Sequence, residues 1–299
     1  MKIAIAGASG LVGREVVSLC AKAGHHTIQI DRASPESSPP GGGPKSSETE
    51  HRTADIANSY SETLDAMRSA DAVIHLAAIP NPVDKDNSLV HSNNVNSAFN
   101  GFHAAAELGI KNYCYVSSVN AIGLAYANRP LTFDHFPMLE THTRRPTDAY
   151  ALAKAETELQ AFSFADWFPH MKIAVLRIHQ VSPRAAVRDE HAAEWDVKGV
   201  KQLWGWVSPA ATARACLLGV DESKKFPDGS NCEVFNIAAP TTTQEDPGLA
   251  GHAGMSSRQL AQKYFPNAQI REGWGEGNEG FWDTEKAERI LGWSHEERE

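Results

Sequence analysis

The chain opens with Lys2-Ile-Ala-Ile-Ala6, which runs directly into Gly7-Ala-Ser-Gly10-Leu-Val-Gly13. The first segment predicts a short strand buried on both faces, because its apolar run lacks polar alternation. The second segment places three glycines at intervals of three residues, which permits a tight turn and a close approach of the backbone to a ligand. A helix that begins there points its N-terminus at the same ligand and favours negative charge. We therefore predict a phosphate-binding loop, although the spacing is not the common G-x-G-x-x-G.

The residues after this loop complete a strand–helix–strand unit. A helix is expected over 14–23 and a second strand over 27–30, with Asp31 at its end. A carboxylate at that point can accept hydrogen bonds from both ribose hydroxyls of NAD and repels the 2′-phosphate of NADP. The guanidinium of Arg32 would suit that phosphate. NAD is the predicted cofactor, with NADP as the alternative.

Strand and helix patterns continue to alternate as far as residue 178. Buried strands are expected over 72–76, 112–117 and 172–178, another precedes Asp55, and helices are expected over 61–69, 94–108 and 150–164. This alternation predicts an α/β fold with a Rossmann-like, doubly wound parallel sheet. We assign residues 1–180 to this dinucleotide-binding domain. Residues 33–50 interrupt it with Pro, Gly and Ser, which cannot bury a face, so we expect a flexible insert there.

The alternation loosens after residue 180. Helices are expected over 209–218, 256–264 and 284–291, and a strand over 233–237. We predict that 181–299 form mainly a small C-terminal substrate-binding lobe, with some segments returning to the Rossmann-like core. Trp204 and Trp206 are expected on a strand-like segment, where alternate residues share a face.

Composition narrows the class of protein. The 299 residues include 37 acidic and 28 basic side chains, a net charge of −9, which argues against a nucleic-acid surface. No apolar run approaches the ~18 residues of a membrane span, and no basic leader precedes the first strand. The four cysteines lie far apart without metal-ligand spacing, which indicates free thiols. We expect a cytoplasmic protein that holds no metal and acts on a small molecule.

Tyr150 and Lys154 are the strongest candidates for chemistry. Four residues apart on a helix, they share a face one turn from each other. A phenol is a poor base at neutral pH because its pKa is ~10, and a neighbouring cation favours the phenolate. Ser118, at the end of a strand thirty-two residues earlier, faces the crevice where open α/β sheets bind ligands. Its hydroxyl could hold a substrate oxygen beside the phenol.

Other residues at strand ends face the same crevice. Asp55 can hold the adenine amino group of a cofactor or cap the next helix. The small residues Ala77 and Ala78 would let a cofactor lie against the backbone. We interpret His75 as a hydrogen-bonded core histidine and not as a catalytic one.

The residues that carry a family resemblance are Gly7, Gly10, Gly13, Asp31, Asp55-Ile56, His75-Leu76-Ala77-Ala78, Asn94, Ser118, Tyr150, Lys154 and Arg177. In order and interval they resemble the short-chain dehydrogenase/reductase superfamily, in its extended, NAD-dependent epimerase/dehydratase-like branch, over about residues 1–183. The resemblance implies that Tyr150 gives or takes a proton, that Ser118 positions the substrate oxygen, and that Lys154 holds the nicotinamide ribose and lowers the Tyr150 pKa. It places Asn94 in the supporting polar network.

The same resemblance implies the remaining site residues and the assembly. The expected cofactor-binding residues are Gly7, Ser9, Gly10, Leu11, Val12, Gly13, Asp31, Arg32, Asp55, Ile56, Leu76, Ala77, Ala78, Asn94, Ser117, Tyr150, Lys154 and Arg177. The expected substrate-binding residues are Pro80, Ser118, Val119, Asn120, His179, Gln180, Lys201 and Trp204. A homodimer through the helices of Asn94 and Tyr150 is expected.

Some residues depart from the family pattern. The chain is weakly similar to uronate dehydrogenases, in which Lys201 falls at the position of a carboxylate-binding Arg, and Pro80 and Gln180 at positions of substrate-binding serines. The sequence therefore does not specify a uronate substrate.

Three functions remain open. The first is an NAD(P)-dependent oxidoreductase that acts on a hydroxyl or carbonyl of a sugar-like molecule or secondary metabolite. The second is a sugar or sugar-nucleotide epimerase or dehydratase that recycles its cofactor; a dehydratase needs a further acid, for which Asp134, His135 and Glu140 are candidates. A nucleotide substrate needs cations, and the dense basic group in the right region is Arg184, Arg188, Lys198 and Lys201. The third is a non-catalytic dinucleotide sensor.

Overall fold

The computed structural model describes residues 1–33, 49–227, 229–243 and 254–295. A seven-stranded parallel sheet runs through the molecule in the order β3-β2-β1-β4-β5-β7-β8. The strands are β1 (Lys2–Ala6), β2 (His26–Asp31), β3 (Thr49–Thr53), β4 (Ala72–His75), β5 (Asn112–Ser118), β7 (Lys172–Ile178) and β8 (Cys232–Ile237). The strand order reverses between β1 and β4, and a crevice opens at the carboxyl ends of strands at such a point. This confirms the predicted fold class.

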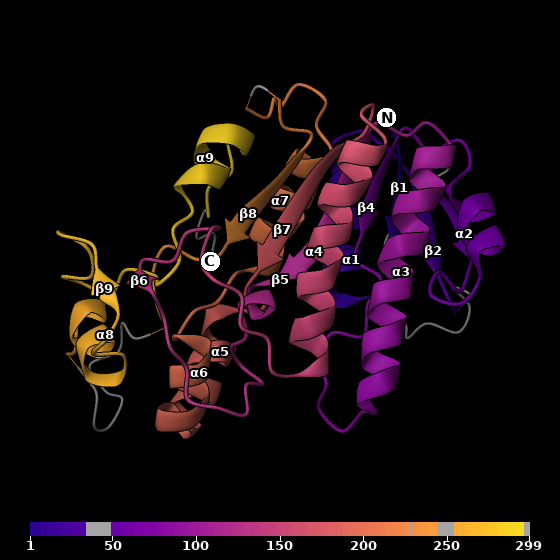
Figure 1. Cartoon of the computed structure of the whole chain (residues 1–299). Coiled ribbons are helices and arrows are strands. Elements are labelled where there is room, and N and C mark those ends of the chain that lie inside the picture. The colour runs from indigo at the N-terminus through magenta and orange to yellow at the C-terminus, as the bar shows by residue number, and fades with distance from the viewer. Residues whose placement is uncertain (34–48, 228, 244–253, 296–299) are drawn as a thin grey trace.

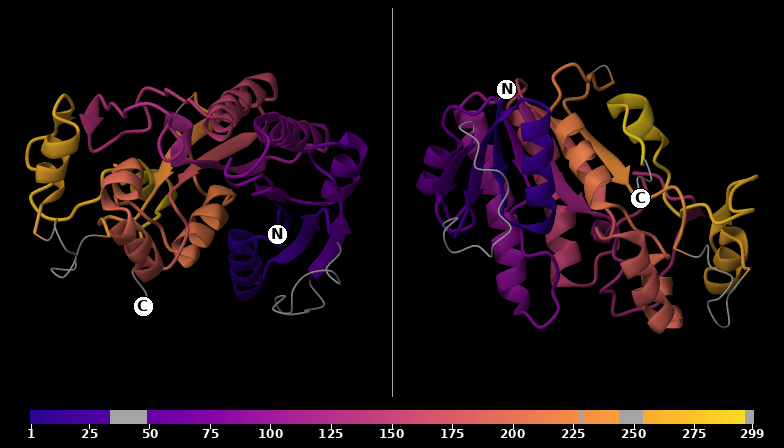
Figure 2. Two further views of the ribbon diagram at one scale, coloured as in Figure 1. Left: turned by 90° about the horizontal axis from the view of Figure 1, so that it is seen from below. Right: turned by 180° about the vertical axis from the view of Figure 1, so that it is seen from behind.

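Helices cover both faces of the sheet (Figures 1 and 2). On one face lie α2 (Tyr60–Met67), α3 (Asn87–Glu107) and α4 (Ala149–Trp167), and on the other lie α1 (Leu11–Lys22) and α7 (Pro209–Gly219). Each face buries its own apolar cluster against the strands. The near-continuous apolar strands are explained by this double cover, since neither face of the sheet meets water.

The second half of the chain adds to the core and, together with β6 from the first half, builds a lobe beyond β8 (Figure 1). Strand β8, α7 and α9 (Glu285–Leu291) belong to the sheet and its cover. The lobe contains β6 (His135–Phe136), β9 (Gln269–Ile270), which pairs with β6 in parallel, and α8 (Ser257–Tyr264). An aromatic cluster around Phe136 and Phe281 fills it. The predicted domain boundary between residues 180 and 181 stays a prediction.

Two sequence expectations about helices were incomplete. Helix α3 begins at Asn87, seven residues before the expected start at residue 94, because the carboxylate of Asp86 accepts a hydrogen bond from the Leu89 N–H and caps it. Helix α5 (Arg184–Ala193) was not predicted; its mean hydropathy is low and its apolar pattern is short. The insert expected over 33–50 falls largely outside the described residues, but Thr49 and Glu50 already belong to β3.

The strand-like segment predicted for Trp204 and Trp206 is wrong. The chain forms a short helix, α6 (Val200–Gln202), and then turns through left-handed backbone at Leu203 and Trp204, where φ is 49° at each residue. The two indoles consequently enter different apolar clusters. No helix in the described part of the chain is long and apolar enough to cross a membrane.

Candidate active site

The glycine loop lies between β1 and α1 and keeps the backbone open to a ligand. Gly7 has φ +82°, and a Cβ on it would lie 2.9 Å from the backbone nitrogen of Ala77. A Cβ on Gly13 would collide with the Gly7 carbonyl. Gly10 is the N-cap of α1 and provides no side-chain acceptor for the first-turn N–H groups. Uncapped N–H groups at a helix N-terminus favour an anion such as a diphosphate.

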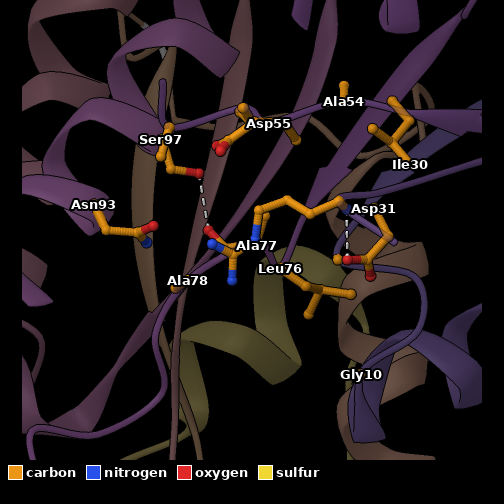
Figure 3. Close-up of a pocket in the computed structure, with 14 residues that line it drawn as sticks. Gly10, Ile30, Asp31, Ala54, Asp55, Leu76, Ala77, Ala78, Asn93 and Ser97 are labelled. Atoms are coloured by element: carbon orange, nitrogen blue, oxygen red, sulfur yellow. Dashed lines mark hydrogen bonds between the residues drawn. The ribbon is translucent and has the colours of Figure 1, made fainter. Parts of the chain in front are cut away.

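A first cavity, of about 180 Å³, adjoins this loop at the end of β2 (Figure 3). The carboxylate of Asp31 lines it and accepts hydrogen bonds from the N–H of Ser9 at 3.1 Å and of Arg32 at 2.8 Å. Asp55 lines it too and accepts hydrogen bonds from Asn58. Asp55 does not cap α2, because Ser59 does so through its hydroxyl. The other lining residues are Gly7, Gly10, Ile30, Arg32, Ala54, Ile56, Ala57, Leu76, Ala77, Ala78, Asn93 and Ser97.

A second, larger cavity of about 530 Å³ shares Gly7, Gly10, Leu76 and Ala78 with the first. It extends from the glycine loop, including Leu11, Val12 and Gly13, to Ser117, Ser118, Tyr150 and Lys154. The two cavities therefore form one crevice, with an acidic end at Asp31 and a hydroxyl-rich end at Tyr150. The sequence predicted this juxtaposition of residues that lie more than a hundred positions apart.

Tyr150 and Lys154 lie in the first two turns of α4, beside the end of β5. The Lys154 ammonium donates to the Val116 carbonyl at 2.7 Å and lies 5.9 Å from the centre of the Tyr150 ring. Burial lowers the pKa of Lys154 to about 8, and Glu158 opposes that shift. Burial raises the pKa of Tyr150, although a hydrogen bond with Ser118 acts the other way. The sequence predicted that Lys154 would lower the pKa of Tyr150. The pKa is instead raised, because a buried phenolate loses its hydration.

The hydroxyl of Ser118 is oriented by the residues that follow it. Its oxygen accepts from the backbone N–H of Asn120 at 3.1 Å and from the Asn120 side-chain amide at 3.3 Å. Because both of these Asn120 groups are donors, the Ser118 hydroxyl is the acceptor in each contact. Its own proton is therefore available to an acceptor in the crevice. This is the arrangement needed to hold an oxygen beside the Tyr150 phenol.

Asn94, His75 and Arg177 support the crevice without lining it, and the expected cofactor residue Ser9 lines neither cavity. Asn94 holds the chain after β4, since its side chain accepts from the N–H of Ile79 at 2.7 Å and donates to the Ile79 carbonyl at 3.0 Å. His75 is a hydrogen-bonded core residue, as predicted, with Tyr113 and Ser97 as partners. Arg177 is fully buried and lines neither cavity.

Arg177 belongs to a buried ion-pair network behind the crevice. Its guanidinium donates to both carboxylate oxygens of Glu158, at 2.8 and 2.7 Å. The Ser117 hydroxyl donates to the same carboxylate at 2.8 Å, and Arg144 approaches it at 3.2 Å. The network joins α4 to β5 and β7, so the cofactor role expected for Arg177 has a structural alternative.

The substrate end of the large cavity differs in part from the expectation. Pro80, Asn120, His179 and Gln180 line it as predicted. Val119 and Trp204 are buried in the lobe cluster, and the Lys201 ammonium donates to the Ala127 carbonyl at 2.9 Å; none of these three lines the cavity.

Seven residues that line the large cavity were missed: the polar Asn81, Tyr126, Glu190 and Gln202, and the apolar Val116, Ile178 and Val181. Tyr126 packs edge-on against the Tyr150 ring, with centroids 6.0 Å apart. The four polar residues lie on connections and on the short helices α5 and α6, where no periodic pattern identifies the cavity side. The acid candidates Asp134, His135 and Glu140 do not line either cavity.

Comparisons with known proteins agree with this arrangement. The model of the NAD dependent epimerase/dehydratase family matches residues 3–198. A dTDP-6-deoxy-L-talose 4-dehydrogenase (NAD(+)) from Aggregatibacter actinomycetemcomitans is 29% identical over 185 residues, which are 61% of this chain and 62% of the relative. An NAD-dependent glucose-6-phosphate dehydrogenase from Haloferax volcanii is 30% identical over 136 residues, 44% of this chain and 50% of the relative. The matches thus span about half to three-fifths of these relatives.

Solved structures share the fold over the whole chain. A UDP-glucose 4-epimerase from Thermotoga maritima superposes with a TM-score of 0.67 at 20% identity, covering 99% of this chain and 94% of the other. The match to the family model covers the glycine loop, Asp31, Ser118, Tyr150 and Lys154 together. The chain therefore belongs to the NAD dependent epimerase/dehydratase family.

Proposed function

We propose that this protein is an NAD-dependent oxidoreductase that acts on a hydroxyl or carbonyl group of a sugar-like small molecule. The observation that carries the proposal is the single crevice that joins the glycine loop and Asp31 to Ser118, Tyr150 and Lys154. The NAD-dependent sugar dehydrogenases among its relatives support it.

The residues of the crevice fit the cofactor. The glycine loop and the N-terminus of α1 would hold the diphosphate, Asp31 the adenosine ribose, and Lys154 the nicotinamide ribose. Two features support this fit: the backbone at Gly7, which leaves no room for a side chain, and the uncapped N-terminus of α1. When bound, NAD supplies a carbon that accepts or returns a hydride.

In the proposed mechanism the protein handles the proton. Ser118 donates to the substrate oxygen and holds it beside Tyr150. The phenol, whose pKa burial raises, is protonated at neutral pH and gives its proton to that oxygen in the reducing direction. In the oxidising direction it takes the proton back, and the Lys154 cation favours the phenolate that this step requires. Tyr150 is 7% exposed, so bulk water is kept from the transfer.

Tyr150→Phe tests this proposal. We expect turnover to fall by roughly 10²–10⁴-fold, because general acid–base catalysis contributes about that factor. The dissociation constant for NAD should stay nearly unchanged. The assay follows NADH formation with a panel of aldoses and alcohols, and cofactor affinity is measured by calorimetry. Tyr126→Phe, in the same cavity, is the matched control and should retain most activity; an active Tyr150→Phe protein would contradict the proposed role.

Epimerisation or dehydration with a recycled cofactor is the second candidate, because the family model that matches the chain covers both reactions. Product formation without net NADH would favour it. NAD binding with no turnover on the panel would favour a non-catalytic sensor.

We further propose a homodimer through α3 and α4. Exposed apolar side chains gather on these helices, among them Phe99, Leu159, Phe162 and Trp167, which are 41%, 63%, 38% and 65% exposed. Val95, Phe99, Leu159 and Trp167 line one shallow groove. A cytoplasmic location also stays a proposal, supported by four buried, unpaired cysteines.

A further inference from the structure

The substrate end of the large cavity is short of positive charge. We propose that it selects an uncharged, hydroxyl-bearing substrate against substrates that carry a carboxylate or phosphate, and that Glu190 is the residue that sets this preference. The inference rests on the proposed function, because it assigns a substrate class to the same crevice.

Glu190 is the only carboxylate among the described residues that line the cavity. It lies on α5, and its side chain is 43% exposed. One carboxylate oxygen accepts a hydrogen bond from the side-chain amide of Gln180 at 2.7 Å. Only the N–H₂ end of an amide can donate to a carboxylate, so this contact also fixes which way the Gln180 amide is turned. Glu190 therefore contributes negative charge and orients a second lining residue.

The cations near this end of the crevice already have protein partners. Lys201 donates to the Ala127 carbonyl, and Lys198 pairs with Glu194 at 3.0 Å and with Glu190 at 3.7 Å, so that two carboxylates share one ammonium. Arg184 donates to the Thr242 carbonyl, and Arg188 pairs with Asp189 at 3.0 Å. None of these four side chains lines the cavity. The basic group that a nucleotide diphosphate would need is thus held by protein groups and lies outside the cavity lining.

The other described side chains that line this end are either uncharged or already hydrogen-bonded to the protein. Lys154 is the only cation among them, and its ammonium is held by the Val116 carbonyl beside Tyr150. Burial lowers the pKa of His179 to about 3, so this imidazole is uncharged at neutral pH. Asn81, Asn120, Gln180 and Gln202 offer amide groups.

An anionic group placed here would lose hydration next to Glu190, whose cation partner Lys198 is shared with Glu194 and leaves this group of side chains with a net negative charge. A buried charge without a partner is costly, and like charges in one site provide discrimination by repulsion. Hydroxyl groups avoid both costs, because amides and carboxylates exchange hydrogen bonds with them. The lining therefore fits a neutral polyol or aldose.

The test compares matched ligand pairs: D-glucose with D-glucuronate and with glucose 6-phosphate, and D-galactose with D-galacturonate. Binding to the NADH-loaded protein is measured by calorimetry, and turnover with NAD by NADH formation. We expect the wild-type protein to bind each neutral member about tenfold more tightly. Glu190→Gln keeps an acceptor for the Gln180 amide but removes the charge, and should reduce that ratio roughly threefold. Glu190→Lys should abolish or reverse it.

Asp189→Asn is the matched control, because this neighbouring carboxylate does not line the cavity and should leave the ratio unchanged. Tighter binding of the anionic members by the wild-type protein, or a ratio that Glu190→Lys does not alter, overturns the inference. Failure of every pair to bind overturns it as well. A neutral preference in binding with no NADH formed from either member would retain the charge preference and contradict the proposed oxidoreductase activity, so the two failures are distinguishable.

Discussion

At the scale of single residues, some side chains that line the crevice also hold the backbone around it. Asp31 is the clearest example, because its carboxylate accepts from the N–H groups of Ser9 and Arg32 while it lines the cavity at the end of β2. It fixes the glycine loop against β2 and provides the charge that a 2′-phosphate would meet.

Asp31→Asn removes the negative charge and keeps part of the backbone contact. Ser9 and Arg32 donate to different carboxylate oxygens, so the single amide oxygen can keep one of these two hydrogen bonds. We expect the preference for NAD over NADP, measured as the ratio of kcat/KM values, to fall about tenfold, equivalent to ~1.4 kcal/mol. Asp55→Asn, a carboxylate change in the same cavity, should alter this ratio little. An unchanged ratio in Asp31→Asn would discredit the assignment of the ribose site.

At the scale of secondary-structure elements, helix α4, which carries Tyr150 and Lys154, is fixed by a buried charge network. Glu158 lies one turn beyond Lys154 on α4 and is fully buried, as is Arg177 on β7. Through Glu158 the helix is joined to Ser117 on β5 and to Arg177 on β7. Displacement of α4 along the sheet would leave these polar groups unpaired, and burying unpaired charge is costly.

Glu158→Gln should therefore destabilise the protein strongly. It leaves the Arg177 cation buried without a compensating charge, and breaking such a pair costs about 3–5 kcal/mol. Glu156→Gln, two residues away on the same helix, removes a partly exposed partner of His91 and should cost no more than ~1 kcal/mol. Urea unfolding of both variants measures the difference, and equal losses would refute a structural role for the network.

At the scale of the whole molecule, strand order opens the crevice and the second half of the chain closes its substrate end. The reversal between β1 and β4 places the glycine loop beside Ala77, and the segments after β7 contribute Gln180, Glu190 and Gln202. Assembly into a dimer and the pH dependence of stability also belong to the whole molecule.

The proposed dimer predicts that charge on the α3–α4 surface yields monomers. Leu159→Glu places a carboxylate at the most exposed leucine of α4, where an interface would have to bury it unpaired. Light scattering should show half the wild-type mass. Leu139→Glu, at an exposed leucine outside these helices, is the control and should leave the mass unchanged. A monomeric wild-type protein would contradict the proposal.

Acid should destabilise the fold through its buried histidines. Burial lowers the pKa values of His75, His179 and His191 to about 4, 3 and 4, whereas an unfolded histidine titrates near ~6.5. Between these values the unfolded chain binds more protons, so stability is full above about pH 6.5 and falls as the pH decreases towards 4. Thermal unfolding from pH 8 to 4.5 measures this slope.

A matched pair of variants tests the cause of that slope. His75→Gln removes a buried titrating group and should make the slope shallower. His26→Gln changes an exposed histidine and should leave the slope as it is. A midpoint that does not move between pH 8 and 4.5 would show that these histidines are not the source of acid sensitivity.

The local sequence was sufficient for the glycine loop, Asp31 at the end of β2, and the Tyr150–Lys154 pair on a helix. Each depends on short-range physics: a turn that needs glycine, a strand that ends at a charge, and side chains one helical turn apart. Alternating apolar segments then specified a parallel sheet, which brings strand ends to one edge. For this reason the sequence alone was enough to place Ser118 beside Tyr150.

Only the tertiary structure determined what lines the substrate end. Tyr126, Glu190 and Gln202 face the cavity because of how the connections after β5 and β7 pack, and those segments carry no periodic pattern that specifies a direction. Lys201 is turned away by the Ala127 carbonyl, and Trp204 enters the lobe through left-handed backbone. Such positions depend on contacts between residues distant in the chain, whose energies no local pattern records. The Tyr150–Lys154 pair is thus set locally, whereas the lining of the proposed substrate end is set by packing.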